Sequence, residues 1–228
     1  EDGGIHAGGE FFARAMARGI NFVNHTHGDD GAGRNRDLDR LRRRWRGGFG
    51  GRRGFGIHVG GGFHHTFADH AEGFCYINDI AVAIRVLQQE KVIKRAAVVD
   101  CDVHQGNGTA HIFQNDLSVF TFSIHQEHNY PVKQHSDLDI GLRDGATDEE
   151  YLKALATVIP KRLDEFAPDL VIYNAGADPY KQDLLGGLDL TKAGLAARDD
   201  MVIGYCAERS IPIVSVLAGG YAADLSDT

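Results

Sequence analysis

Short apolar runs alternate along the chain with segments whose apolar residues recur at helical spacing. The apolar runs are bounded by polar clusters, which is typical of buried strands, and they lie at residues 57–59, 96–99, 119–124, 170–173 and 211–217. Between two of these runs, residues 77–90 place Ile80, Ile84 and Leu87 on one face of a helix. Strands that alternate with helices predict an α/β domain of three layers, α/β/α, around a mostly parallel sheet.

Two further helices are predicted from the residues at their ends. Thr147 and Glu150 have the spacing of a capping box, which indicates that a helix begins there. Pro160 lies inside this helical pattern and has no backbone N–H, so we expect it to kink or end the helix. Residues 191–209 form another helical pattern, which two glycines make less regular.

The segment at residues 28–56 has a different composition, rich in arginine and glycine and poor in apolar periodicity. Its stretch Arg34–Arg53 has two interpretations. It is either a basic tail that contacts anions or a disordered segment with too little apolar surface to order itself. The second interpretation is favoured. His25, His27 and Asp29 precede this stretch, and we interpret them as solvated loop residues rather than a metal site.

Composition and charge exclude several classes of protein. With 43% hydrophobic and 25% charged residues, the chain resembles an ordinary globular protein. Residues 1–53 carry 11 basic and 7 acidic residues, whereas residues 54–228 carry 13 and 25, and an acidic body argues against nucleic acid as a partner. No stretch approaches the ~18 apolar residues of a membrane span, and the first residues lack the pattern of a signal peptide. We therefore expect no membrane partner and a cytoplasmic location, or a nuclear one in a eukaryote.

Polar residues cluster at the ends of four predicted strands. The clusters are GGGFHH at 60–65, DCDVHQGNG at 100–108, NAGAD at 174–178 and AGGY at 218–221. In open α/β sheets, ligands bind beyond the carboxyl ends of the strands. If the sheet is parallel, the four clusters share one rim and form one site.

The second of these clusters has the residue types of a metal site. Asp100, Asp102 and His104 alternate, so an extended chain points all three to one side. Asp102 and His104 would supply an oxygen and a nitrogen ligand, and Asp178 from another strand end would complete three ligands. Three protein ligands leave a position open, as in catalytic zinc sites. Asp100 then suits an outer position, where it orients a neighbouring histidine.

The other two clusters contain groups suited to proton transfer and charge stabilisation. His64 and His65 follow three glycines, and adjacent histidines in a turn can both face a cavity and exchange protons near neutral pH. Tyr221 follows two glycines at a strand end and can donate a hydrogen bond to a developing oxyanion.

Six motifs in order and spacing resemble the zinc-dependent histone deacetylase family. They are GGGFHH at 60–65, EGFCYINDIAVAI at 72–84, VVDCDVHQGNG at 98–108, YNAGADP at 173–179, LGGLDLT at 185–191 and AGGY at 218–221. The resemblance covers about residues 56–222, and GGGFHH together with HQGNG is similar to the class IV branch and its bacterial relatives. It implies an arginase-like α/β/α fold.

The resemblance also implies a role for each matching residue. Zinc would be held by Asp102, His104 and Asp178. His65 would be the proton-transfer residue and Tyr221 would polarise the scissile carbonyl. His64 would pair with Asp100, and Asn107 would face His65, where many members have an aspartate. The implied substrate tunnel consists of Gly73, Phe74, Tyr130, Gly219 and Gly220. A structural potassium site is implied near Asp100, Asp102, His104 and Ser123.

Residues 56–228 are therefore interpreted as a partial histone deacetylase-like catalytic domain, and residues 1–55 as an atypical N-terminal segment. Family domains are usually longer, roughly 300 residues or more. Part of the N-terminal region and the helices that follow the AGGY motif have no counterpart in the sequence. We expect the chain to be a fragment, truncated at both ends.

The predicted function is zinc-dependent hydrolysis of the amide bond of an acyl-lysine side chain in a protein. One alternative is the same chemistry on acetylated polyamines or another small acylated amine. A second is an inactive, truncated protein that keeps a metal or acyl-lysine binding site. A manganese ureohydrolase of related fold is less favoured, because its two-metal site needs more acids and histidines around the DxDxH motif.

Overall fold

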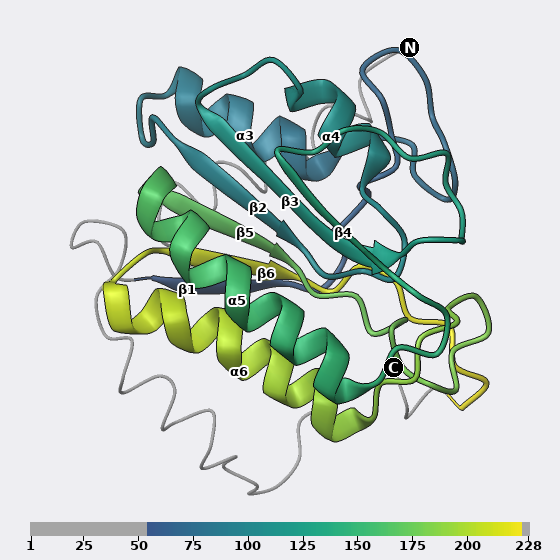
Figure 1. Cartoon of the computed structure of the whole chain (residues 1–228). Helices are drawn as coiled ribbons and strands as arrows, with labels where there is room; N and C mark the ends of the chain where they lie inside the picture. The colour runs from purple at the N-terminus through teal and green to yellow at the C-terminus, as the bar shows by residue number, and fades with distance from the viewer. Residues whose placement is uncertain (1–53, 225–228) are drawn as a thin grey trace, which may run out of the picture.

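The computed structural model describes residues 54–224. The expectations for residues 1–53, including the Arg34–Arg53 stretch and the cluster near His25, lie outside the described residues. The described part forms one six-stranded sheet with helices on both faces (Figure 1).

All neighbouring strands of the sheet are parallel, which confirms the predicted fold class. The strand order is β1-β6-β5-β2-β3-β4. Their bounds are β1 Phe55–His58, β2 Ala96–Asp100, β3 Val119–Gln126, β4 Leu138–Leu142, β5 Leu170–Asn174 and β6 Ile213–Val216. β2, β3, β5 and β6 are buried at every residue, as continuous apolar runs in a parallel sheet covered on both faces should be.

Among residues 54–224, four helices make the outer layers. α3 (Asp79–Gln89) and α4 (Asn107–Phe113) lie on one face of the sheet, and α5 (Asp148–Phe166) and α6 (Lys192–Arg209) lie on the other (Figure 1). Strand side chains alternate between these layers. In β2, for example, Ala97 and Val99 belong to the core under α5 and α6, whereas Ala96 and Val98 belong to the core under α3.

The predicted helix starts agree closely with the structure. Asn78 caps α3 by accepting the N–H of Ala81 at 2.9 Å, and the face of α3 with Ile80 is buried as expected. At α5, the Glu150 carboxylate accepts the N–H of Thr147 at 3.0 Å, which is the carboxylate half of the predicted capping box.

Pro160 was expected to kink or end its helix, and it does not end it, because α5 continues to Phe166. A proline inside a helix costs about 3 kcal/mol through its lost hydrogen bond and its ring. The residues Ile159 and Leu163 on either side are fully buried, and each contributes roughly 1.5–3 kcal/mol by burial. Packing of the helix on both sides of the proline therefore offsets its cost.

Two elements were not predicted from the sequence. β4 is an edge strand whose Leu138, Ile140 and Leu142 face the core while the residues between them are exposed. This alternation is a weak but real strand pattern. α4 is only seven residues long and begins inside the polar cluster after β2. Its few apolar residues do not form a recognisable helical pattern, so the sequence did not predict it.

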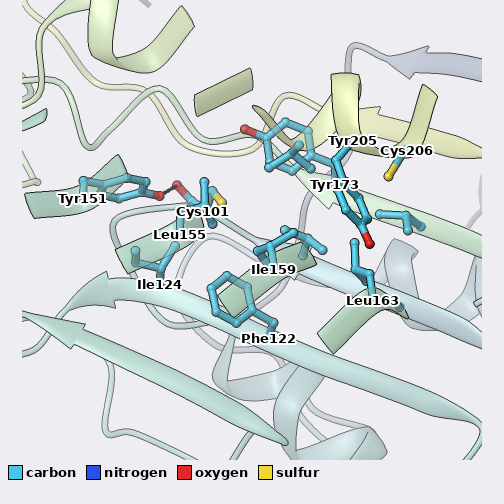
Figure 2. Packing of buried hydrophobic residues seen from close by; sticks show 14 of the residues in the cluster. Cys101, Phe122, Ile124, Tyr151, Leu155, Ile159, Leu163, Tyr173, Tyr205 and Cys206 are labelled. Atoms are coloured by element: carbon cyan, nitrogen blue, oxygen red, sulfur yellow. Dashed lines mark hydrogen bonds between the residues drawn. The ribbon is translucent and has the colours of Figure 1, made fainter. Parts of the chain in front are cut away.

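The core between the sheet and the helices α5 and α6 is the largest in the described residues (Figure 2). Leu155 is fully buried in it, so we expect Leu155→Ala to lower the free energy of unfolding by about 2–5 kcal/mol, measured by urea denaturation. The matched control is Leu117→Ala, since Leu117 is 94% exposed and its truncation is expected to change that free energy by less than about 0.5 kcal/mol. Equal effects of the two substitutions would contradict the described packing.

No helix among residues 54–224 is both long enough and apolar enough to cross a bilayer.

Candidate active site

The four polar clusters come together because they follow four adjacent parallel strands. β1, β6, β5 and β2 are consecutive in the sheet, and their carboxyl ends form one rim. A pocket opens at this rim. Its lining comes from the clusters after β1, β2 and β6 and from Phe74 and Cys75. It consists of Gly61, Gly62, Phe63, His64, His65, Phe74, Cys75, Asp102, His104, Ala218, Gly219 and Tyr221.

Asp102, His104 and Asp178 meet at the base of this rim. One ligand atom from each lies within 4.8 Å of those of the other two, and all three residues are buried. His104 Nδ1 faces both carboxylates, at 3.1 Å from Asp102 Oδ1 and 3.2 Å from Asp178 Oδ2. The contact to Asp178 Oδ2 lies outside hydrogen-bond geometry, so this buried oxygen has no hydrogen-bond partner among the described residues.

This group fits a bound divalent cation. Burial and the neighbouring charge of Asp102 raise the pKa of the Asp178 carboxyl to about 7. Two carboxylates held together away from water repel one another unless a cation lies between them. Two oxygen ligands and one imidazole nitrogen suit zinc, and three protein ligands are the number found in catalytic zinc sites. The unpartnered Asp178 Oδ2 supports the same conclusion.

The backbone between Asp100 and His104 turns because carboxylates of this segment accept hydrogen bonds from its own backbone N–H groups. Asp100 Oδ1 accepts the N–H of Asp102 at 3.1 Å, and Asp102 Oδ1 accepts the N–H of His104 at 2.9 Å. These short-range bonds end β2 at Asp100, whereas the sequence suggested a continued extended chain. The predicted separation of side chains still holds, since Cys101 and Val103 lie in the core.

Glycines let the backbone approach the carboxylates from the other strand ends. Gly219 donates its N–H to Asp102 Oδ2 at 3.0 Å, and a Cβ on Gly219 would lie 2.7 Å from that oxygen. A Cβ on Gly176 would also lie 2.7 Å from Asp102 Oδ2. Any side chain at either position would enter the space between the carboxylates, so glycine is required there.

His64 is buried and paired with a carboxylate. Its Nδ1 lies 2.7 Å from Asp100 Oδ2, and Asp100 Oδ1 also accepts the Asn174 side-chain amide at 2.9 Å. Burial alone would lower the pKa of His64, but Asp100 and Asp102 raise it to about 9. The imidazole is therefore held in its charged form near neutral pH in the metal-free site.

His65 has the opposite electrostatic environment. Its Nδ1 lies 2.8 Å from Asn107 Oδ1, and its ring centroid lies 4.1 Å from that of His64. Burial and the charge of His64 lower the pKa of His65 to about 3. Two adjacent histidines thus differ strongly in proton affinity, and His65 is the neutral one.

Tyr221 lines the same pocket as the two histidines. Asp183 accepts the Tyr221 N–H at 2.6 Å, and the Tyr221 ring centroid lies 6.0 Å from that of Phe74. Burial and the carboxylates of Asp102 and Asp178 raise the pKa of the Tyr221 hydroxyl to about 12. The phenol therefore keeps its proton and remains a hydrogen-bond donor.

Of the residues expected to form a substrate tunnel, some line the pocket and others pack against His65. Phe74 and Gly219 line the pocket, and the Phe74 side chain is 70% exposed at its mouth. Gly73 has φ of 59° and lies against His65, where a Cβ would be 3.0 Å from Cδ2. Tyr130 packs edge-on against His65, with ring centroids 5.1 Å apart.

Gly220, the remaining tunnel residue, lies between Gly219 and Tyr221 and is part of the segment that brings the tyrosine to the pocket. Ser123 pairs in register with Asp100 on the neighbouring strand β3, and its hydroxyl lies 2.9 Å from His125 Nδ1.

Sequence reasoning missed three carboxylates that support the site. Asp79 accepts the N–H groups of Gly62 and Phe63 and so holds the glycine turn before the histidines. Asp183 holds the backbone of Tyr221, and Glu72 bonds to the side chain of Asn107 at 2.9 Å. Glu72 and Asp79 lie inside the EGFCYINDIAVAI motif, but their partners are distant in sequence, so spacing alone could not identify them.

Known proteins resemble this chain in sequence and in structure. A family model described as "Histone deacetylase domain" matches residues 47–227. This chain belongs to the histone deacetylase family. A crystal structure of the HDA15 HD domain is similar, with a TM-score of 0.64 and 33% identity over 76% of this chain and 54% of that one.

Two curated proteins are similar to this chain in sequence, one named as a histone deacetylase and one uncharacterized. "Histone deacetylase 2" of Arabidopsis thaliana is 35% identical over 74% of this chain and 45% of its own length. An uncharacterized protein of Picosynechococcus sp. is 46% identical over 76% of this chain and 58% of its own length. The chain thus spans about half the length of these relatives.

Proposed function

We propose that this protein is a zinc-dependent deacylase that hydrolyses the amide bond of acyl-lysine side chains. One observation carries the proposal: the buried Asp102, His104 and Asp178 group lies beside His64, His65 and Tyr221 at one pocket. A metal group, a neutral histidine and a phenol donor are the parts that amide hydrolysis requires. Membership of the histone deacetylase family supports acyl-lysine as the substrate.

Asp102, His104 and Asp178 are the residues that would hold zinc. When bound, zinc would supply Lewis-acid chemistry, polarising the amide carbonyl and activating water for attack. Gly176 and Gly219 keep the space beside the two carboxylates free of side chains. The potassium site expected near Asp100 and Ser123 and the similarity to class IV both stay predictions.

His65 is the proposed proton acceptor. It is neutral because of burial and of His64, and its Nδ1 is engaged by Asn107. The free Nε2 is therefore the atom that takes a proton from the attacking water. Return of a proton from a histidine to the leaving amine nitrogen completes the cleavage. His64 is held beside His65 by Asp100, whose Oδ2 lies 2.7 Å from His64 Nδ1.

Tyr221 is the proposed donor to the oxygen on which negative charge develops. Its hydroxyl stays protonated, since its pKa is raised to about 12, and it lines the same pocket as His65. A donor aimed at a developing oxyanion stabilises the transition state more than the ground state. Phe74, exposed at the pocket mouth, offers an apolar surface to the methylene groups of a lysine side chain.

The test is hydrolysis of acyl-lysine peptides of graded chain length by the purified chain, after metal content is measured by mass spectrometry. We expect about one zinc per chain, hydrolysis of at least one peptide, and loss of activity with a chelator that added zinc restores. An N-acetylated polyamine serves as the competing substrate. Turnover of the polyamine without turnover of any peptide would replace the proposed substrate, and bound zinc without hydrolysis of either would contradict the proposed activity.

A further inference from the structure

Glu72 is connected to His65 through the side chain of Asn107, and the proposed reaction does not use it. Its Oε1 accepts the Asn107 side-chain N–H at 2.9 Å and the Tyr130 hydroxyl at 3.0 Å. Its Oε2 lies 3.7 Å from His70 Nε2, and the side chain is 29% exposed. A single carboxylate thus connects three segments that surround His65.

The hydrogen bonds in this group have only one consistent direction. An ionised carboxylate only accepts, so Asn107 must turn its NH₂ toward Glu72. The amide oxygen of Asn107 then faces His65, where Oδ1 lies 2.8 Å from Nδ1. An oxygen acceptor requires that Nδ1 carries a proton, so the lone pair of neutral His65 is on Nε2.

We propose that Glu72 is a positioning residue that fixes the tautomer of His65 through Asn107. This proposal rests on the proposed function in one respect, since it takes His65 as the residue that transfers a proton in the reaction. Without Glu72, nothing in the described contacts of Asn107 decides which end of its amide faces the imidazole. With Nδ2 turned toward His65, the ring would have to accept at Nδ1, and Nε2 would carry the proton and lose its capacity as a base.

The backbone next to Glu72 is shaped for this contact. Gly73 has φ of 59°, a conformation that favours glycine, and a Cβ there would lie 3.0 Å from His65 Cδ2 and 3.1 Å from the Tyr130 hydroxyl. The absence of a side chain at Gly73 lets the backbone next to Glu72 lie against His65 and Tyr130. Tyr130 in turn packs edge-on against both His65 and His104, so the same carboxylate also holds the ring that covers the two imidazoles.

Variants of Glu72 and Tyr130 separate the orientation of the Asn107 amide from the charge of the Glu72 carboxylate. Glu72→Ala removes the acceptor, whereas Glu72→Gln keeps an oxygen that can accept from both Asn107 and Tyr130. Tyr130→Phe removes the second hydrogen bond only. Glu90→Ala is the control, because Glu90 is exposed at the end of α3, on the surface and outside the site.

The direct readout is the tautomer of His65, read from long-range ¹⁵N–¹H spectra of the protein labelled in its histidines, with the His65 signals assigned by their loss in His65→Gln. We expect Nδ1 to be protonated in the wild type, in Glu72→Gln, in Tyr130→Phe and in Glu90→Ala. In Glu72→Ala the two ring nitrogen shifts are expected to move toward each other as the tautomers mix. An unchanged tautomer in Glu72→Ala would overturn the proposal, and the same change in Tyr130→Phe would overturn the route through Asn107.

Kinetics give the second readout. Glu72 is not among the described residues that line the pocket, so Glu72→Ala should lower kcat by about tenfold with little change in KM, and Glu72→Gln should restore most of kcat. An equal loss in both variants would contradict a role in orientation. If the wild type hydrolyses no acyl-lysine peptide, the proposed function fails, and the tautomer comparison still decides the role of Glu72.

Discussion

Replacing Asp178 by alanine is expected to remove zinc binding and activity together. Asp178 is one of three buried ligand residues, and its Oδ2 has no other hydrogen-bond partner among residues 54–224. Two remaining ligands do not make a stable zinc site. We expect zinc per chain, measured by mass spectrometry, to fall from about one to near zero.

A second variant separates metal loss from misfolding, because Asp178 Oδ1 also accepts the N–H of Val103 at 2.8 Å. Asp178→Asn keeps an oxygen for that hydrogen bond and removes the charge. It should retain the wild-type unfolding midpoint in urea without added metal while zinc affinity falls steeply. The control is Asp200→Ala, at an exposed position of α6. Full zinc occupancy in Asp178→Ala would exclude Asp178 from the ligand set.

Removing the hydroxyl of Tyr221 is expected to stop turnover while zinc remains bound. Tyr221→Phe keeps the ring and its contact with Phe74, so it isolates the hydrogen bond. Loss of one oxyanion donor lowers kcat by roughly 10²–10³-fold. Because this interaction forms mainly in the transition state, KM and zinc content should change little.

The matched control is Tyr76→Phe, since Tyr76 is 84% exposed and its hydroxyl is on the surface. We expect wild-type kcat from it. Turnover of Tyr221→Phe within a few-fold of the wild type would remove the tyrosine from the reaction. A large rise in KM at constant kcat would instead assign Tyr221 to substrate binding.

The sequence predicted the sheet and its rim well because the information for them is local. A short continuous apolar run such as the one ending at Asp100 is typical of a buried strand, and polar residues directly after such a strand lie at its carboxyl end. Parallel pairing then brings distant clusters together without further information. The contact between His64 and Asp100 follows from this geometry, with 2.7 Å between Nδ1 and Oδ2.

Features that depend on tertiary packing were not predictable in the same way. The continuation of α5 past Pro160 depends on the burial of Ile159 and Leu163, which no local propensity encodes. Glu72 was not singled out from the sequence, because its two hydrogen-bond partners, Asn107 and Tyr130, come from other segments. Roles of this kind are set by which loops meet, and sequence spacing does not contain that information.

The position of β1 has a consequence for how the protein folds. Within residues 54–224, β1 is an edge strand that pairs with β6 alone, and Phe55 pairs with Ile213 near the opposite end of the described chain. Pairing of segments so far apart carries a high loop-closure entropy and is expected to form late. The histidines that follow β1 thus reach the carboxylates only when the longest-range contact in the sheet closes. During refolding, recovery of activity is therefore expected to lag behind recovery of helical circular dichroism.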